Sequence, residues 1–420
     1  FRFSAGRSGD TRVYVLPSLD EAAWRFRTPT LRVQRVVGFS REQDQIYVVS
    51  PDSDLVALDL TAGRARTVDS NVTAVVLGPT GRLHLVHRNG TVGAIEYRST
   101  SSWPTRLDST AVFSLWGAGG GRLLAAIAND SGTGLVTASS GKAPASHQLP
   151  RGALAVSSWG DLVVITVDSG LVQLDPFTAS RGTFSRLEPP PAAVAVSPPG
   201  HRLYAAGPDG MLSEIDRFEG EVLDRLQLPG PAREIRVDPL GRMLLARPLD
   251  GDSLWLVDLA ELDLLATLPG RWRDDLPTVA PNGSLLLIRG ADLVAVSPDS
   301  FVVTGRVAGG ARDLWLTAAW DPRRPSLQLV SDTAAAPTVQ PGQELFVQVS
   351  STSNEAWAQD MARDLRSAGM QATVLPPSAE EDRYRVVLGP FPTREAAEDI
   401  GRKLGRPFWI FTREQRPPTP

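Results

Sequence analysis

Short runs of alternating hydrophobic and polar or small residues fill most of the chain, and glycine, proline, asparagine or aspartate bounds each run. Residues 193–228 show the pattern best. Four such runs are separated there by three tight turns, Ser-Pro-Pro-Gly, Pro-Asp-Gly and Glu-Gly. Runs of this length between turn-forming residues indicate the strands of an antiparallel meander. The stretch therefore predicts one sheet of four short strands.

The same unit recurs along the chain at a nearly constant spacing. A turn glycine follows the first strand of each unit, at steps of 39 to 42 residues after a first step of 37. The glycines are Gly81, Gly121, Gly160, Gly200, Gly241 and Gly283, and Asp44 stands in the equivalent place of the first unit. A period near forty with four strands per unit is typical of β-propeller blades. A single four-stranded sheet cannot bury both of its faces, so each unit must stack on its neighbours.

The two ends of this repeat region predict how the ring closes. Seven complete units run from about Leu31 to Val307, and two strands are predicted on each side of them. The four strands are Arg12–Leu16, Ala22–Phe26, Asp313–Ala319 and Ser326–Val330. Pairing of the two ends would complete an eighth blade and leave no open edge. The sequence thus predicts an eight-bladed propeller over residues 1–330, with seven blades as the alternative if either terminal pair is irregular.

The period changes after the propeller. Residues 331–342 are small, polar and rich in proline, which predicts a linker. Residues 343–413 then follow the order βαββαβ, and 414–420 form a tail. That order predicts an α+β, ferredoxin-like module whose two helices cover one face of a four-stranded sheet.

Local signals place the elements of this module. Thr352 and Glu355 match a capping box that would begin the first helix, and Gly369 stands where a C-cap glycine belongs. Thr393 is the predicted cap of the second helix. The first helix has an apolar face formed by Ala358, Met361, Ala362 and Leu365. The strands are predicted at Glu344–Ser350, Gln371–Leu375, Tyr384–Leu388 and Pro407–Thr412.

The face of the small sheet that carries no helix is the main candidate site. Side chains alternate along a strand, so one set points away from the helices. That set is Phe346, Gln348, Ser350, Arg385, Val387 and Trp409. Aromatic surface beside amide, hydroxyl and guanidinium groups suits a saccharide. A solvated face, or a face that docks on the propeller, is also compatible with the pattern.

A family resemblance supports the first of these alternatives. The segments LFVQVSSTSN, LRSAG and YRVVLGPFPTREAA resemble a SPOR (sporulation-related repeat) domain over roughly Glu344–Thr412, less than a fifth of the chain. The resemblance implies binding to peptidoglycan glycan strands denuded of their stem peptides, usually at bacterial division sites. It also implies that Gln348, Ser351 and Trp409 contact the glycan, while Val387 departs from the charged or polar residue that the family often carries. The predicted glycan-binding set is therefore Phe346, Gln348, Ser350, Ser351, Arg385 and Trp409.

The propeller resembles the broad group of WD40/YVTN-like surface and periplasmic repeat propellers with SPDG-like turns. That likeness implies a shape and no chemistry.

Composition and charge exclude several classes of protein. The formal net charge of −4 argues against a nucleic-acid binder. There is no cysteine, which excludes disulfides, zinc–thiolate sites and covalently attached haem. No run of eighteen apolar residues occurs, so no transmembrane span is predicted. The chain begins with Phe1, which is compatible with removal of a signal peptide or of a lipid anchor.

The propeller sequence offers no recognisable catalytic set, and no catalytic residue, metal or cofactor is predicted. His84 and His87 lie three apart on a strand and should face opposite sides, and His201 lies beside a turn glycine, where solvent exposure is expected. Gly117–Gly121 lacks the Lys-Ser/Thr ending of a phosphate loop and predicts a stretched hairpin turn. Aspartates that recur at the ends of third strands predict turn capping: Asp59, Asp175, Asp216 and Asp258. Packing is the predicted role of Trp315 and Trp320.

Taken together, these observations predict a non-catalytic protein of the bacterial cell envelope, either periplasmic or an outer-membrane lipoprotein. The SPOR-like module would bind peptidoglycan during cell division, and the propeller would be a scaffold for an unidentified protein partner. Two alternatives remain at this point. One is a propeller enzyme acting on envelope sugars or lactones, and the other is a subunit of a larger assembly that uses the module for docking.

Overall fold

A computed structural model describes residues 1–414 with several gaps. The residues outside the description are 5–10, 23–30, 41–43, 61, 63, 97–98, 130–131, 179, 274–275, 277, 319–342, 353–354, 368, 378–382, 404–407 and 415–420. The predicted linker at 331–342 and the predicted strand Ser326–Val330 therefore lie outside the described residues.

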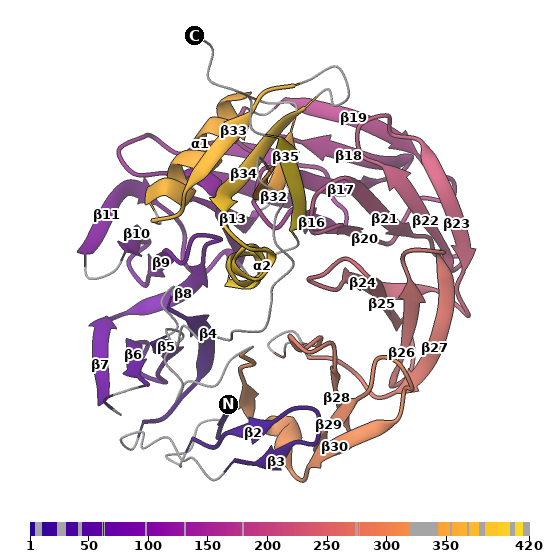
Figure 1. The fold of residues 1–420 in the computed structure, drawn as a ribbon, viewed down its shortest axis with the longest axis horizontal. Coiled ribbons are helices and arrows are strands. Elements are labelled where there is room, and N and C mark those ends of the chain that lie inside the picture. The colour runs from indigo at the N-terminus through magenta and orange to yellow at the C-terminus, as the bar shows by residue number, and fades with distance from the viewer. Residues whose placement is uncertain are drawn as a thin grey trace.

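Between Arg35 and Pro269 the described chain forms six consecutive four-stranded antiparallel sheets arranged around a ring (Figure 1). The first three sheets are β4 (Arg35–Phe39), β5 (Gln45–Val49), β6 (Leu55–Asp59) and β7 (Arg64–Asp69); β8 (Val72–Leu77), β9 (Leu83–His87), β10 (Thr91–Glu96) and β11 (Ser99–Arg106); and β12 (Val112–Ala118), β13 (Arg122–Asn129), β14 (Gly132–Ala138) and β15 (Ala145–Leu149). The next three are β16 (Leu154–Val156), β17 (Val163–Val167), β18 (Gly170–Leu174) and β19 (Arg181–Arg186); β20 (Ala193–Val196), β21 (Arg202–Ala206), β22 (Met211–Asp216) and β23 (Val222–Gln227); and β24 (Ala232–Val237), β25 (Met243–Pro248), β26 (Ser253–Asp258) and β27 (Asp263–Pro269). These are the predicted propeller blades.

The seventh blade has three regular strands, β28 (Leu285–Arg289), β29 (Asp292–Val296) and β30 (Val303–Val307). Isolated bridges join Arg271 to Ile288 and Val279 to Leu285 on the inner side of this sheet. An irregular inner edge thus replaces the fourth strand.

The recurring glycines serve the turns that the spacing predicts. Five of them have φ between 71° and 85°, and each amide donates a hydrogen bond of 2.8–2.9 Å to the carbonyl three residues earlier. They are Gly81, Gly160, Gly200, Gly241 and Gly283. Positive φ favours glycine because it has no Cβ. The predicted turn capping is also confirmed, since Asp59, Asp175, Asp216 and Asp258 each accept a backbone amide hydrogen bond two or three residues later.

Hydrophobic clusters between neighbouring blades hold the ring together. Leu55 of the first blade packs with Leu83 and Leu85 of the second, and all three side chains are almost fully buried. Ala206 of the fifth blade packs in the same way with Leu244 of the sixth. These blades therefore bury their faces against their neighbours.

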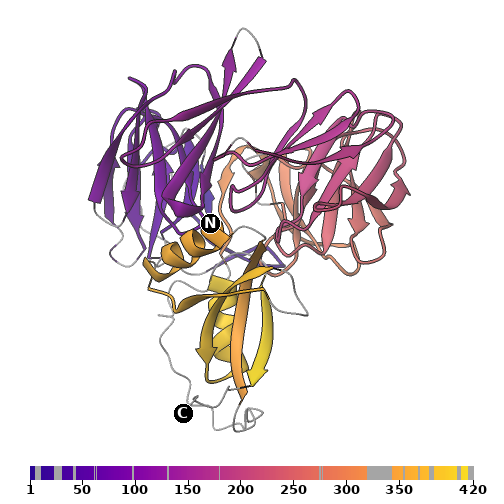
Figure 2. The ribbon, with the colours of Figure 1, turned by 90° about the horizontal axis from the view of Figure 1, so that it is seen from above.

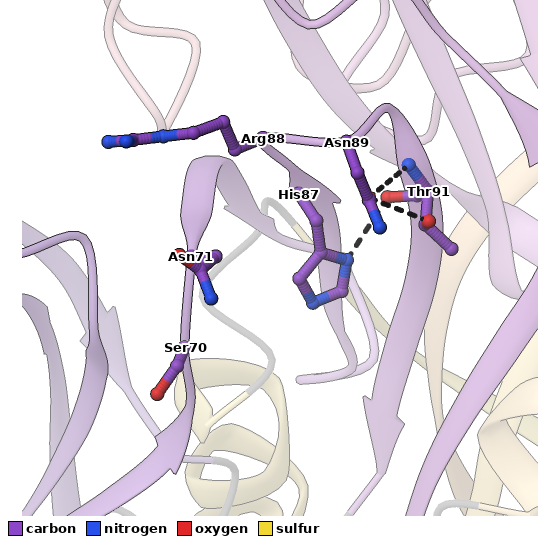
Figure 3. Close-up of a pocket in the computed structure, with 6 residues that line it drawn as sticks. All are labelled: Ser70, Asn71, His87, Arg88, Asn89 and Thr91. Carbon is purple, nitrogen blue, oxygen red and sulfur yellow. Dashed lines mark hydrogen bonds between the residues drawn. The ribbon is translucent and has the colours of Figure 1, made fainter.

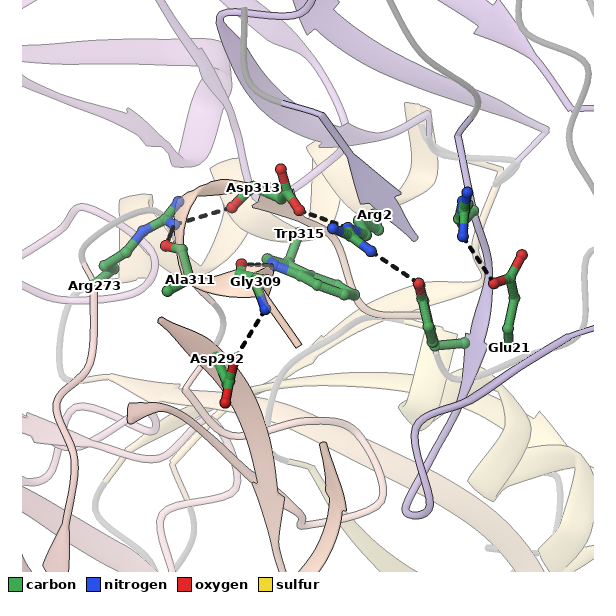
Figure 4. Close-up of polar contacts among 11 residues, drawn as sticks. Arg2, Glu21, Arg273, Asp292, Gly309, Ala311, Asp313 and Trp315 are labelled. Atoms are coloured by element: carbon green, nitrogen blue, oxygen red, sulfur yellow. Dashed lines mark hydrogen bonds and ion pairs between the residues drawn. The ribbon is translucent and has the colours of Figure 1, made fainter. Parts of the chain in front are cut away.

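The ring closes with strands from both ends of the propeller, as predicted, but in a different proportion. Figure 4 shows Arg2 from the start of the chain paired with Asp313, just before the closing strand. β31 (Leu314–Trp315) pairs with β1 (Arg2–Phe3). Arg2 also forms an isolated bridge with Arg12. The next two strands of the chain, β2 (Tyr14–Val15) and β3 (Asp20–Glu21), pair with each other. One segment thus comes from beyond the seventh blade and three come from the N-terminal side. The strand β1 was not predicted, because two residues are too few to show alternation.

The predicted strand Ala22–Phe26 lies outside the described residues except for Ala22, because residues 23–30 are not described. The described strand β3 ends at Glu21. The closing segments pack between the seventh and first blades. Trp315 contacts Ala295 and Val307 of the seventh blade, and Phe3 contacts Ile46 of the first. Eight units in all therefore surround the ring within the described chain.

The C-terminal module has the predicted βαββαβ order. Its sheet is arranged β33-β34-β32-β35, and its helices pack on one face. The elements are β32 (Gln343–Thr352), α1 (Glu355–Ser367), β33 (Ala372–Leu375), β34 (Tyr384–Phe391), α2 (Arg394–Lys403) and β35 (Trp409–Glu414). The predicted apolar face of α1 is confirmed, because Ala358, Met361, Ala362 and Leu365 are at most 1% exposed.

Two of the three predicted helix-end signals are confirmed. Gly369 has φ 75° and closes α1 with a hydrogen bond to Arg366 O, and Thr393 Oγ1 accepts from Ala396 N at the start of α2. The predicted cap of the first helix, Thr352, ends β32, where it pairs with Tyr384, and α1 begins at Glu355 after residues 353–354, which lie outside the described residues.

The module lies on one side of the propeller disc (Figure 2). In the view down the ring, α2 projects onto the middle of the ring and α1 lies near the second and third blades (Figure 1). The face of the propeller that meets the module carries the turns between first and second strands, including the short 3-10 helix η1 (Gly119–Gly121).

Candidate functional site

The register of the small sheet places the two principal candidate residues side by side. Gln348 on β32 is directly opposite Trp409 on β35 and opposite Val387 on β34. Residues directly opposite each other in an antiparallel pair point to the same face. Val347 and Val349, the neighbours of Gln348 in sequence, pack under the helices. Gln348 and Trp409 therefore share the face that carries no helix, which we call the open face.

The open face presents aromatic and polar surface together. The Trp409 side chain is 71% exposed, an unusual value for so large an apolar group. Gln348, opposite Trp409, and Arg385, farther along the same face, are half-buried. Because the indole is exposed and an amide and a guanidinium lie on the same surface, the face can stack on a ring and donate hydrogen bonds at once.

Phe346 lies on the open face as predicted, but it offers little surface to a ligand. It is 8% exposed and stacks on Phe411 with ring centroids 5.9 Å apart and planes 26° from parallel. Arg385 lies over the Phe411 ring at 5.5 Å. Phe346 thus supports the aromatic floor of the open face.

A bulge in β32 corrects the prediction for Ser350. The register with β34 shifts between Gln348 and Ser350, so Ser350 lies opposite Val386 and Ser351 opposite Arg385. Val386 is packed under the helices, so Ser350 shares its side and the prediction that Ser350 is on the open face is wrong. An extra residue in one strand inverts the alternation beyond it. Ser351, which is 7% exposed, takes the place on the open face.

The other side of the module docks on the propeller through α1, which the sequence did not predict. Asp364 on α1 accepts a hydrogen bond from the backbone amide of Gly120 in η1, and Asp360 pairs with Arg122 at 2.8 Å. The predicted hairpin turn at Gly117–Gly121 is therefore also a receptor for a helix from another domain.

A tryptophan of the propeller extends this contact into the core of the module. Trp159, in the turn between β16 and β17, is 3% exposed and packs with Ala358 and Met361 of α1. Its ring lies edge-on to Trp357 at 6.2 Å. A Cβ at Gly119 would lie 1.9 Å from Trp159 Nε1, so a residue without a side chain is needed there. We call this contact of α1 with η1 and Trp159 the docking interface.

A separate contact lies at the propeller end of the open face. Arg383, just before β34, stacks on Phe218 with its guanidinium carbon 3.3 Å from the ring centroid, and its Nη1 lies 3.5 Å from His201 Nδ1. The prediction that His201 is solvent-exposed is therefore wrong. Burial, followed by the nearby charge of Arg383, lowers the pKa of His201 to about 4.

Asp364 gives a testable prediction about the docking interface. Burial raises the pKa of this carboxyl, although Gly120 donates a hydrogen bond to it. Because folding raises the pKa, the stabilising contribution of Asp364 is complete below its unfolded pKa and is lost as the pH rises through the folded one. Asp364→Asn keeps an acceptor without the charge and should preserve docking at neutral pH. Asp364→Ala leaves the amide unpaired and should cost about 1–3 kcal/mol.

Thermal unfolding of the full chain from pH 4 to pH 8 measures this difference. Glu398→Asn and Glu398→Ala on α2, outside the docking interface, are the matched controls. Equal losses for Asp364→Asn and Asp364→Ala at neutral pH would mean that attraction to Arg82, and not burial, dominates at this carboxyl.

Among the described residues, two hollows lie on the opposite side of the propeller. One of about 490 Å³ is lined by Ser70 and Asn71 before β8 and by residues 87–89 and Thr91 at the turn between β9 and β10 (Figure 3). His87 in its wall contacts Thr91 O at 3.1 Å and Asp69 at 3.2 Å. The other, about 290 Å³, lies between the third and fourth blades and is lined by apolar side chains that include Phe113 and Trp116. Both hollows lie at the starts of first strands, away from η1.

The other propeller residues singled out in the sequence are packed in the protein interior where the structure describes them. His84 is 1% exposed, lies edge-on to Trp103 at 5.5 Å, and burial lowers its pKa to about 3. Trp315 is packed as predicted, and Trp320 lies outside the described residues. Within the described ranges, no three His, Asp or Glu side chains gather closely enough to hold a metal ion. No helix in the described part of the chain combines the length and hydrophobicity needed to cross a bilayer.

The family model of the SPOR domain matches residues 341–407. A SPOR domain implies binding to peptidoglycan and a location in the cell envelope or periplasm. A comparison with curated proteins gave no match.

Solved structures match the propeller. Dihydro-heme d1 dehydrogenase NirN in complex with DHE is 13% identical with a TM-score of 0.51, over 73% of this chain and 72% of that one. AztD from Citrobacter koseri is 13% identical with a TM-score of 0.50, over 74% and 95%. Hydrazine synthase from Kuenenia stuttgartiensis is 14% identical with a TM-score of 0.31, over 37% of this chain and 48% of that one. NirN and AztD are β-propellers, and at this identity the likeness is one of fold alone. The chain is therefore similar to β-propellers over its first part, and its C-terminal module is a SPOR domain.

Proposed function

We propose that this chain is a non-catalytic cell-envelope protein that binds peptidoglycan glycan strands denuded of their stem peptides. The open face of the SPOR domain is the binding surface, and the propeller is a scaffold for a protein partner. The observation that carries the proposal is the pairing of Gln348 with the exposed Trp409 on the face opposite the helices.

The chemistry of this pair suits a glycan. A sugar ring has apolar C–H faces, which stack on an indole, and its hydroxyl and acetamido groups require donors and acceptors at the rim. Gln348 supplies both kinds of group from the neighbouring strand. Arg385 and Ser351 continue the polar surface along β34 and β32 toward the propeller. A strand with bulky stem peptides would not lie flat on such a face, whereas a peptide-free strand would.

Retention on immobilised glycan strands stripped of peptides tests the assignment. Trp409→Ala should lower the affinity about tenfold, since the loss of one stacking partner costs about 1–1.5 kcal/mol. Gln348→Ala should lower it about threefold to tenfold through the loss of a hydrogen bond. Phe113→Ala, which removes a 60% exposed ring on the far side of the propeller, is the matched control. Equal retention of the wild type and all three variants would exclude the assigned surface.

The propeller role is supported by the docking interface. Because α1 is held by η1 and Trp159, the face of the disc with the two hollows points away from the SPOR domain. A partner bound there would be held at a fixed orientation to peptidoglycan. In a dividing cell, this arrangement would bring the partner to division sites, where denuded strands occur. The protein would act in the periplasm, including as an outer-membrane lipoprotein.

A further inference from the structure

The open face does not end at the edge of the SPOR sheet, because the propeller continues it. Arg385 lies on the open face opposite Ser351, and Arg383 stands two residues earlier, just before β34. The Arg383 side chain reaches Phe218 in the turn after β22, at 3.3 Å. A surface that begins at Trp409 therefore runs along the sheet and ends on the fifth blade.

Three arginines from the two domains gather at this junction. Arg217 donates to Gly200 O at 3.1 Å, and its guanidinium carbon lies 5.3 Å from the Phe218 ring centroid. Arg202 lies on β21 beside His201 and is paired with Glu214 and Asp216. Asp161 lies 3.7 Å from Arg217, a separation longer than a direct charge-assisted hydrogen bond.

His201 lies among the charged groups of this junction. A guanidinium only donates, so His201 Nδ1 accepts from Arg383 Nη1 and the imidazole is neutral. After burial, the charges of Arg383, Arg217 and Arg202 are the causes that lower its pKa, and Asp216 alone opposes them. Guanidinium groups of both domains therefore lie close to this imidazole, beside the carboxylates of Glu214, Asp216 and Asp161 that pair with Arg202 and Arg217.

We propose that Arg217, Arg383, Phe218 and His201 form an arginine corner that binds a carboxylate of an acidic saccharide lying on the open face. The proposal rests on the proposed function and deepens it. When the stem peptide is attached, the lactyl group of a muramyl residue is an amide, and when the peptide is removed it is a carboxylate. An arginine corner that binds this carboxylate would select denuded strands by their charge. This selection would add to the one made by the fit of a flat strand on the sheet.

The geometry favours a planar anion. Arginine matches a carboxylate with two parallel N–H donors, and two guanidiniums from different domains can hold one carboxylate between them. Phe218 orients Arg383 by stacking, which reduces the freedom that binding would otherwise remove. Neither domain supplies the corner by itself, so the docked arrangement of the full chain is required.

The test uses the full chain and two forms of the same peptide-free glycan strands. In one form the lactyl carboxylates are intact, and in the other they are converted to neutral methylamides. The wild type should bind the carboxylate form about tenfold more tightly, and this preference should weaken at high salt. Arg217→Gln should abolish most of the preference while binding of the neutral form stays unchanged. Arg217 is held within the propeller by Gly200 and Asp161, so this change leaves the docking interface in place.

Arg186→Gln is the matched control, because it removes one positive charge from an exposed residue on the outer strand β19. Arg186→Gln should keep the preference for the carboxylate form of the glycan. Equal binding of the two glycan forms by the wild type, or an unchanged preference in Arg217→Gln, would overturn the arginine corner. Failure of the wild type to bind either form would instead contradict the proposed function, so the two failures are distinguishable.

Discussion

Trp159→Ala is expected to release the SPOR domain from the propeller. The indole is 3% exposed and fills a position in the hydrophobic core of the other domain, among Ala358, Met361 and Trp357. Replacing a buried tryptophan by alanine costs about 3–5 kcal/mol, through lost transfer free energy and the cavity that remains. Most of this loss should fall on docking, because the ring belongs to a turn of the propeller and packs chiefly against α1.

Two measurements separate release from general destabilisation. Small-angle scattering should give a larger radius of gyration for Trp159→Ala than for the wild type. Thermal unfolding should show the SPOR domain melting earlier than the propeller. Trp103→Ala is the matched control, since Trp103 is 4% exposed inside the second blade and touches no part of the SPOR domain's core cluster. It should lower the melting temperature of the propeller and leave the radius of gyration unchanged. An unchanged radius in Trp159→Ala would mean that the polar contacts of Asp360 and Asp364 hold the domain alone.

The docking interface changes what the propeller can do for a peptidoglycan binder. A domain on a free tether samples many orientations, whereas a domain fixed by a helix and an arginine stack presents its binding face in one. In the proposed site the propeller contributes residues as well as carrying the SPOR domain, because Arg383 of the SPOR domain and Arg217 both lie against Phe218.

The repeat architecture was predictable because every level of the sequence agrees. Turn glycines such as Gly200 require positive φ, and aspartates such as Asp216 cap the following turn. The period and the strand lengths are then compatible with one architecture, the β-propeller. The alternation that placed Gln348 and Trp409 on one face was equally secure, because each strand has a hydrophobic set that must lie under the helices.

The bulge and the docking interface were not predictable for physical reasons. A bulge adds one residue without disturbing the local alternation, so only the pairing with β34 reveals that Ser351 replaces Ser350. Asp364 lies on the polar side of an amphipathic helix, where an acidic residue ordinarily indicates a solvated surface. Nothing in the sequence links it to Gly120, which lies 244 positions earlier. Each of these two surfaces has a composition that is also compatible with solvent exposure. Their contact therefore produces no recognisable sequence pattern in either segment.

Trp315→Ala is expected to open the ring at its closure. Trp315 pairs through its backbone with Arg2, donates from Nε1 to Gly310 O at 3.0 Å and lies 5.4 Å from the Tyr14 ring (Figure 4). The side chain is 5% exposed and joins the seventh blade to segments from the start of the chain. The loss should be about 3–5 kcal/mol, and the melting temperature of the propeller should fall by about 5–10 °C.

Hydrogen exchange locates this effect. In Trp315→Ala the amides of β1 and β31 should lose protection before those of the six four-stranded blades, because the closing pair has only two residues in each strand. Trp255→Ala is the matched control, since Trp255 is 6% exposed between the fifth and sixth blades. It should cost a similar free energy and leave the order of exchange as in the wild type. If β1 stays protected in Trp315→Ala to the same extent as in Trp255→Ala, the ring is held closed by the Phe3–Leu314 contacts with the first blade and not by the tryptophan.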